Sequence, residues 1–307
     1  MIELADLPTR RTEAWKYSDL RRAMDENVQF AIGRDRSDPA VERAGAAGGV
    51  IGALAAQMGG VEALEVAAGE TAMRIDRPKY SNLEPRFLQV NLAAGASLTR
   101  IVLQSNRADA VILDAAHVRL GKDAKFRQFI LAEGAKLARI ETHVSIEGEG
   151  AQVELNGAYM CGEGRHGDLT STIEHKIGAG QTRQLIKGVA RKGGRGVFQG
   201  KIVVDHGAQK TDARQYHHGL LLEDGAEIFA KPELMIHADD VQCAHGNTAG
   251  GLDETALFYM RSRGLPEAEA RALLIEAFLT EAVPDWTQSE ANDEIVERIR
   301  VWLRGAS

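Results

Sequence analysis

Glycine–alanine dipeptides recur through the middle of this chain, and each is followed by a strand-like run of residues. The dipeptides begin at Gly95, Gly134, Gly150, Gly178, Gly207 and Gly225. The runs between them, such as SLTRIVLQ, AKFRQFILAE and FQGKIVVD, are rich in β-branched and aromatic residues. Because glycine readily forms tight turns and the runs are short, the pattern predicts a mainly β body with almost no helix.

The spacing of these turns is irregular, and this bears on the kind of β architecture. A two-sheet sandwich would accommodate so many short strands. A β-helix fits better, because its turns can differ in length while each rung still buries the next. We therefore favour a β-helix over residues from about 75 to 245, with helices confined to the two ends.

Helical patterns flank this body. On the N-terminal side, residues 12–24 (TEAWKYSDLRRAM) and 52–67 predict helices. On the C-terminal side, Asp253 is a good N-cap, and a later pattern places three apolar residues on one helix face: Ile295, Ile299 and Trp302. The predicted domains are an N-terminal helical segment (1–74), a β-helix core (75–250) and a C-terminal helical domain (251–307).

Composition excludes several classes of protein. The net charge of −7 argues against a general nucleic-acid binder, and acidic residues interleave with Arg10, Arg11, Arg21 and Arg22. Two cysteines give no disulfide framework, which fits a reducing cytosol. The N-terminus is charged and has no apolar core, and no stretch is long and apolar enough to span a membrane. We expect a cytoplasmic protein that binds neither nucleic acid nor membrane.

Cys243 and His245 form the candidate metal site. Side chains alternate along a strand, so both lie on one face. If the alternation of residues 228–238 continues through Asp239–Asp240, both point away from the core; a bend at this acidic pair would swap the faces. A thiol and an imidazole can bind a soft or borderline metal, but zinc takes about four ligands, so a partner chain would have to complete the site. A purely structural role is the alternative, because free cysteine is usually buried and inert.

Three other features carry weaker signals. His217 and His218 are adjacent, so at most one points into any single site; with His206 they could bind metal, although surface histidines are commoner. Residues 191–196 (RKGGRG) resemble a phosphate-binding loop but lack the G-x-x-x-x-G-K-[ST] order and a following helix. Cys161, in MCGEGRHGD, is expected to be an ordinary surface or turn cysteine.

Two motifs carry a resemblance to a known family. The run from about Gln199 to Gly264, which contains KPELMIHADDVQCAHG, resembles the core-to-tail region of SufD, the scaffold subunit of the SUF iron–sulfur cluster assembly system. TEAWKYSDL resembles the N-terminal TE-x-WKY element of the same family. The sister subunit SufB has a glutamate directly after the histidine, where this chain has Gly246, and this favours SufD.

The resemblance implies a right-handed parallel β-helix and a non-catalytic scaffold. It implies pairing with SufB through the β-helix ends and binding of the ATPase SufC through the C-terminal helices. The expected SufC-binding residues are Leu257, Phe258, Tyr259 and Arg261. Cys243 and His245 match SufD positions at the SufB interface, where a transient iron–sulfur cluster is thought to form, with no cofactor bound stably. The resemblance leaves undecided whether the isolated chain forms a homodimer.

Two other classes of function are alternatives. A β-helix enzyme acting on carbohydrate would need clustered carboxylates on one sheet face, and the sequence shows no such cluster. A purely structural oligomerisation module would use the tail merely to cap the β-helix. On the scaffold hypothesis, deleting residues 253–307 should abolish SufC binding and leave the β body folded.

Overall fold

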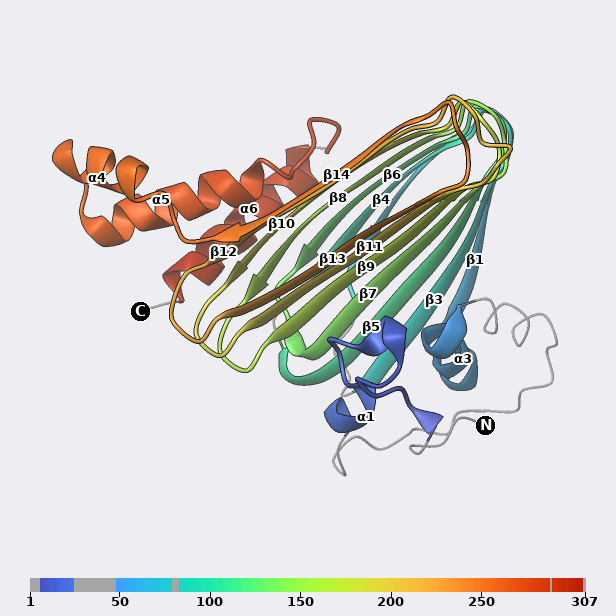
Figure 1. Ribbon diagram of the computed structural model, residues 1–307. Coiled ribbons are helices and arrows are strands. Elements are labelled where there is room, and N and C mark those ends of the chain that lie inside the picture. The colour runs from blue at the N-terminus through green and yellow to red at the C-terminus, as the bar shows by residue number, and fades with distance from the viewer. Residues whose placement is uncertain (1–5, 25–47, 79–82, 106, 288, 306–307) are drawn as a thin grey trace.

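Successive strands of this chain alternate between two parallel sheets, so that each rung contributes one strand to each sheet (Figure 1). The computed structural model describes residues 6–24, 48–78, 83–105, 107–287 and 289–305, and within them each sheet has seven strands. The odd-strand sheet contains β1 (Val61–Val66), β3 (Leu83–Leu92), β5 (Arg107–Leu120), β7 (Ala135–Ile146), β9 (His166–His175), β11 (Arg195–Val204) and β13 (Glu227–Ile236). The even-strand sheet contains β2 (Thr71–Asp76), β4 (Ser97–Gln104), β6 (Lys125–Ala132), β8 (Gln152–Cys161), β10 (Gln181–Ala190), β12 (Asp212–Leu221) and β14 (Gln242–Gly250).

This architecture confirms the predicted parallel β-helix and excludes the antiparallel sandwich. Residues one rung apart lie directly above one another, as the aligned positions Gln152, Gln181, Asp212 and Gln242 show. The rung length is close to thirty residues but varies slightly, which explains why the sequence shows no fixed period. The first strand begins at Val61, earlier than the expected residue 75.

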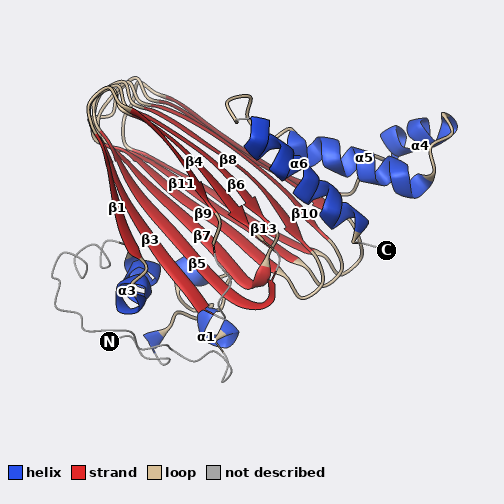
Figure 2. Ribbon diagram, turned by 180° about the vertical axis from the view of Figure 1, so that it is seen from behind, coloured by secondary structure: helices blue, strands red, loops and turns tan. Residues whose placement is uncertain are grey.

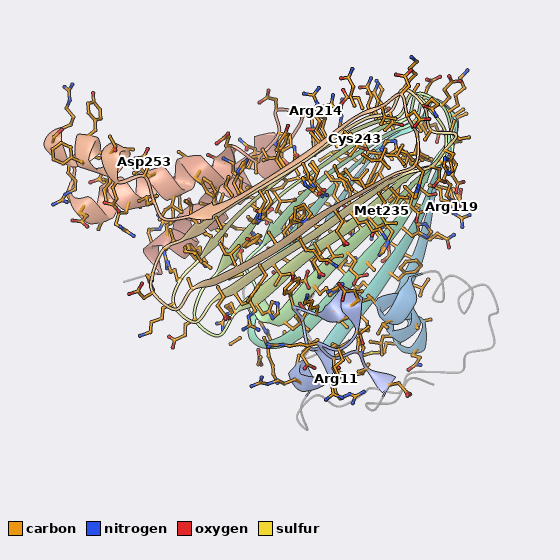
Figure 3. The ribbon with its side chains drawn as sticks, in the orientation of Figure 1. Arg11, Arg119, Arg214, Met235, Cys243 and Asp253 are labelled. Atoms are coloured by element: carbon orange, nitrogen blue, oxygen red, sulfur yellow. The ribbon has the colours of Figure 1, made fainter. Side chains whose placement is uncertain are left out.

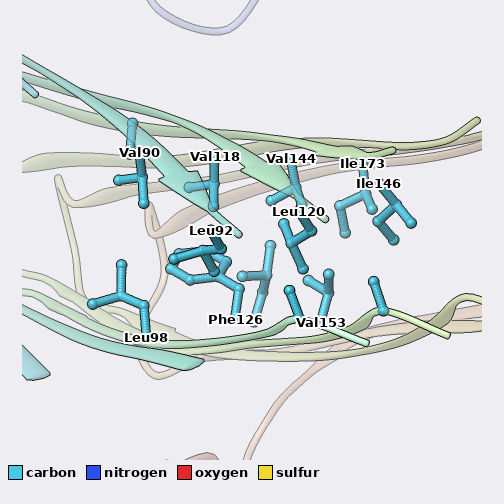
Figure 4. Close-up of a cluster of buried hydrophobic side chains, with 14 of the residues drawn as sticks. Val90, Leu92, Leu98, Val118, Leu120, Phe126, Val144, Ile146, Val153 and Ile173 are labelled. Carbon is cyan, nitrogen blue, oxygen red and sulfur yellow. The ribbon is translucent and has the colours of Figure 1, made fainter. Parts of the chain in front are cut away.

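The main core lies between the two sheets (Figure 4). Apolar side chains from the odd-strand sheet face those of the even-strand sheet. On each side, equivalent positions of successive rungs stack on one another and form a column of apolar side chains. Labelled members are Val90, Val118 and Val144 on one side and Leu98, Phe126 and Val153 on the other. All are buried, so the stacked rungs remove a continuous apolar column from water.

The N-terminal elements cover the outer face of the odd-strand sheet. They are η2 (Glu13–Trp15), α1 (Leu20–Ala23) and α3 (Gly49–Met58), and they form a second apolar cluster with Phe87, Val111 and Leu137. The predicted helix over 52–67 is half wrong: α3 ends where Gly59 adopts a left-handed φ of 74°, and β1 follows. Residues 25–47 of the expected helical segment lie outside the described residues.

The predicted continuous helix over 12–24 is also wrong, because tertiary contacts interrupt it. The Trp15 ring packs 4.1 Å from the Arg139 guanidinium carbon, and the Ser18 hydroxyl donates a 2.5 Å hydrogen bond to Asp168. Asp19 then adopts an extended backbone and caps α1, accepting from the Arg22 N–H. These contacts tie the WKYSD motif to β7 and β9.

The C-terminal helices cover the opposite, even-strand sheet (Figure 2). They are α4 (Glu254–Ser262), α5 (Glu267–Thr280) and α6 (Ser289–Arg304). The predicted face of α6 is confirmed, since Ile295, Ile299 and Trp302 are buried together with Phe129 and Met160. In contrast, α4 extends away from the β-helix (Figure 1). No helix in the described ranges has the length and apolar character needed to cross a membrane.

Candidate functional site at the open end of the β-helix

The last rung of the β-helix is open. Within the described residues, β14 pairs only with β12, and β13 pairs only with β11, so each is the edge of its sheet. Figure 3 labels Cys243 on β14 and Met235 on β13, and the two strands contact each other along this edge. An edge strand presents unpaired backbone N–H and C=O groups, which can pair with another chain.

Cys243 and His245 share one face of β14, as predicted, but that face is the inner one. In the rung below, Cys243 aligns with Ala213 and His245 aligns with Gln215, and both of these residues are fully buried. The outward orientation predicted for an unbroken register is therefore wrong. The chain turns between β13 and β14, so the alternation of residues 228–238 does not carry into β14.

Cys243 is half-buried and packs against the main core. Burial raises the pKa of its thiol above the ordinary value, and the nearby Asp212 carboxylate acts in the same direction, against a backbone hydrogen bond at Ala213. At neutral pH the thiol is thus protonated in the isolated chain. Because the thiolate is the form that binds metal, binding of a metal here would release the thiol proton.

His245 is exposed although its position is an inward-facing one. It continues a column of inward polar residues that includes Gln184 and Gln215, in which the Gln215 amide donates to Gln184 at 2.9 Å. Those lower members are buried because another rung covers them. His245 has no described rung above it, so its imidazole is available to a partner.

Asn247 lies two residues further along the same face of β14 and was not predicted. Its Oδ1 lies 2.7 Å from Nδ1 of the buried His217, whose Nε2 lies 2.9 Å from the Tyr159 hydroxyl. Because Oδ1 can only accept, Nδ1 of His217 carries the proton and Nε2 accepts from Tyr159. Burial lowers the pKa of His217 to about 4, so this residue is a neutral core histidine.

The remaining sequence candidates do not form a metal centre. His218 contacts Thr248 at 2.7 Å, and the His206 ring lies 5.5 Å from the His237 ring. Among the residues that the structure describes, no group of three or more His, Cys, Asp or Glu side chains is placed to hold a metal ion. Cys243 and His245 can therefore supply two ligands at most from this chain.

The prediction for Cys161 is wrong. The residue ends β8 rather than lying in a loop, and it is fully buried in a cluster with Tyr159 and Phe198. Burial raises the pKa of its thiol to about 12, which makes it unreactive.

Large apolar side chains border the open rung. Tyr216, Met235 and Ile236 are all exposed, and they come from β12 and β13. An apolar rim beside an unpaired sheet edge is typical of a protein–protein interface. Neither Asn247 nor this rim was identified from the sequence, although alternation along QCAHGN places Asn247 on the face of Cys243 and His245.

The first tail helix presents a second exposed surface. Phe258 is 72% exposed and Tyr259 is 57% exposed, whereas Leu257 is only 3% exposed. Arg261 is exposed and forms an ion pair with Glu267 at 3.3 Å. Of the four predicted contact residues, Leu257 is therefore buried, and the other three are exposed on α4.

The fold and these two surfaces define the class of protein: a parallel β-helix with an open end and a projecting helical tail, suited to assembly with other chains. Residues 61–278 match the family described as SUF system FeS cluster assembly, SufBD core domain. The chain belongs to this family of iron–sulfur cluster assembly proteins.

Curated relatives agree with the family match. The chain is 34% identical over 205 residues to an iron–sulfur cluster assembly SufBD family protein of Synechocystis. The aligned region covers 67% of this chain and 45% of the relative. The chain is 32% identical over 218 residues to the iron–sulfur cluster assembly protein SufD of Escherichia coli, covering 71% and 52%. A SufBD family protein of Mycobacterium leprae is 27% identical over 301 residues, covering 95% and 75%. The chain thus spans about half the length of the first two relatives.

Proposed function

We propose that this chain is a non-catalytic, SufD-type scaffold subunit that pairs with SufB through the open β-helix end and binds SufC through α4. The observation that carries the proposal is the uncovered last rung, which presents Cys243 and His245 at an unpaired sheet edge with an apolar rim. A partner that adds strands to this edge would cover both residues. In the absence of SufB, a second copy of the chain could occupy the same edge. We place this assembly in the cytoplasm.

Cys243 and His245 would contribute to a composite site completed by SufB. One thiolate and one imidazole leave about two positions of a tetrahedral metal unfilled. The nascent iron–sulfur cluster is then the cargo of the complex. Docking of SufB would bury Cys243 further, so its thiol proton would be released only when the metal binds.

The test is cluster formation by the complex assembled with SufB and SufC. We expect His245→Ala to lower the yield of assembled cluster, and Cys243→Ser to lower it more mildly. Both substitutions should leave the melting temperature of the isolated chain near that of the wild type, because neither residue is fully buried. Cluster yield by absorbance and melting by circular dichroism measure the two effects separately.

His237→Ala is the matched control, since His237 is an exposed histidine in the turn before β14. It should change neither quantity. Unfolding by His245→Ala would show that the residue is structural. A wild-type cluster yield with His245→Ala would remove it from the site.

Docking of SufC is tested by substituting the exposed aromatic residues of α4. Phe258→Ala combined with Tyr259→Ala should weaken SufC binding by ~2 kcal/mol or more, because exposed aromatic residues commonly dominate interface energy. Val301→Ala, an exposed apolar change on α6, is the control. Equal SufC affinity for the double variant and the wild type, measured by calorimetry, would place the dock elsewhere.

The alternative of a carbohydrate-active enzyme receives no support from the carboxylates. Asp76 and Asp114 are buried and each accepts a 2.7 Å hydrogen bond from Arg100. Glu141 and Asp168 are likewise paired with Arg139. These described carboxylates are engaged in internal ion pairs and are not available as an acid–base pair.

A further inference from the structure

A buried side-chain oxygen without a partner lies on the rung directly below His245. It is Oε1 of Gln215, a fully buried residue on the inner face of β12, and no described donor lies within hydrogen-bond distance of it. The parallel register places Gln215 and His245 in the same inward column. Neighbouring strands of a sheet are about 4.8 Å apart, so the two side chains are direct neighbours.

The rest of the Gln215 amide is held in place. Its Nε2 donates to Oε1 of Gln184 at 2.9 Å, and Nε2 of Gln184 donates to the Ser171 hydroxyl at 2.9 Å. On the facing sheet, Gly200 leaves room for this amide, since a Cβ there would lie 2.1 Å from the Gln215 Nε2. Turning the amide over would bring its oxygen against that of Gln184. Gln215 therefore ends a hydrogen-bonded ladder with an acceptor that lacks a donor.

The donor for this acceptor has to come from the last rung. Among the inward residues of β14, only His245 stands above Gln215, because Cys243 and Asn247 lie in the neighbouring columns. His245 is exposed in the isolated chain, so its ring is free to turn. A partner strand that covers the open rung would confine the ring over Gln215. A buried acceptor without a hydrogen bond is destabilising and rare in folded proteins, which favours this contact.

Such a contact would fix the chemistry of the imidazole. A neutral imidazole carries one N–H donor and one unprotonated nitrogen. When the N–H donates to Gln215, the lone pair of the other nitrogen is directed to the opposite side of the ring. Histidines that bind metals usually donate their second ring N–H to an acceptor of the protein, which fixes both the tautomer and the direction of the ring.

We propose that Gln215 is a positioning residue for His245. In the assembled complex, its Oε1 accepts the His245 ring N–H and thereby directs the other ring nitrogen at the metal of the composite site. Gln215 is buried one rung below and does not itself touch the metal. The inference rests on the proposed function, because His245 is a ligand only there.

The test uses the metal-free complex of the full chain with SufB, titrated anaerobically with Co²⁺ alone and followed by absorbance. Gln215→Met keeps the length of the side chain but removes the acceptor, and it should weaken Co²⁺ binding about tenfold. Ring ¹⁵N NMR of the same metal-free complex should show one His245 tautomer in the wild type and a mixture in Gln215→Met. Gln215→Glu keeps an acceptor and should restore both the affinity and the single tautomer.

Gln184→Met is the matched control, because it makes the same change one rung deeper and leaves Oε1 of Gln215 in place. It should lower the melting temperature about as much as Gln215→Met, yet leave the His245 tautomer and the Co²⁺ affinity unchanged. Equal weakening by Gln184→Met would reduce the effect to core packing and overturn the positioning role.

Two further outcomes separate this inference from the proposed function. Wild-type Co²⁺ affinity in Gln215→Met, together with weakened binding in His245→Ala, would overturn the role of Gln215 and leave the composite site intact. Failure of Gln215→Glu to restore the single tautomer would likewise overturn it. Unchanged Co²⁺ binding in His245→Ala would instead remove His245 from the site, and both proposals would fall.

Discussion

At the scale of single residues, the buried Arg139 of β7 forms an ion pair with Glu141 of the same strand and also contacts the N-terminal segment. Nε of Arg139 donates to Glu141 at 2.5 Å, and the same guanidinium donates to the Ala14 carbonyl at 2.7 Å. Burial alone would raise the pKa of Glu141, but Arg139 and His143 outweigh it and hold the pKa at about 2. Replacing Arg139 would leave Glu141 and Asp168 as buried charges without their cation.

This pKa predicts a specific acid sensitivity. A carboxylate with a lowered pKa stabilises the folded state above its unfolded pKa, and that contribution is lost as the pH falls from about 4.5 towards about 2. Glu141→Gln should therefore be less stable than the wild type at pH 6, and the difference should shrink by roughly 2 kcal/mol as the pH falls to about 3. Urea unfolding at the two pH values measures this. Glu149→Gln, at an exposed position, should not change the pH dependence; an unchanged pH dependence in Glu141→Gln would contradict the assignment.

At the scale of elements, the glycine–alanine dipeptides turn the chain between strands, but not all for the same reason. Gly95, Gly134, Gly150 and Gly225 adopt left-handed φ values between 69° and 84°, where glycine is favoured. At the 178–179 dipeptide the left-handed residue is Ala179, with φ 56°. Gly178 is needed instead for close approach, because a Cβ there would lie 2.4 Å from the Gln209 carbonyl oxygen of the next rung.

Gly178→Ala should consequently destabilise the protein by about 1–3 kcal/mol, since the clash is with backbone that cannot rotate away. Gly207→Ala is the matched change in another such dipeptide, where the nearest atom to the added Cβ is 3.7 Å away. It should be tolerated. Equal unfolding midpoints in urea for the two variants would show that rung stacking at this turn is not tight.

At the scale of the whole molecule, the C-terminal tail packs on the β-helix and is part of its fold. α5 and α6 cover an apolar face of the even-strand sheet that includes Ile101, Phe129 and Met160. Arg77, directly after β2, also forms an ion pair with Glu294 of α6 at 2.5 Å. The expectation that a chain without residues 253–307 keeps a stable β body therefore needs revision.

We predict that deletion of residues 253–307 causes self-association and a lower melting temperature, because it exposes that apolar face to water. Size-exclusion chromatography and thermal unfolding measure both effects. The Phe258→Ala, Tyr259→Ala double variant should remain monodisperse and melt like the wild type, which makes it the better test of SufC docking. A truncated chain with the wild-type melting temperature and no aggregation would disprove the structural role of the tail.

Much of the local organisation followed from the sequence by itself. Short β-rich runs between glycine turns favoured a β-helix, and the family resemblance implied that its strands are parallel. The apolar repeat of Ile295, Ile299 and Trp302 predicted the buried face of α6. Alternation placed Cys243 and His245 on one face. Such patterns report the conformation of the segment that contains them, because they arise from backbone periodicity.

Only the tertiary structure determined which side chains on each strand or helix face are covered by other residues and which stay exposed. The turn after β13 directs Cys243 and His245 inward, and the lack of a further described rung leaves His245 exposed. Trp15 and Ser18 break the expected N-terminal helix because their partners, Arg139 and Asp168, lie far away in the sequence. Rung stacking brings together residues about thirty positions apart, and no local pattern specifies which of them becomes covered.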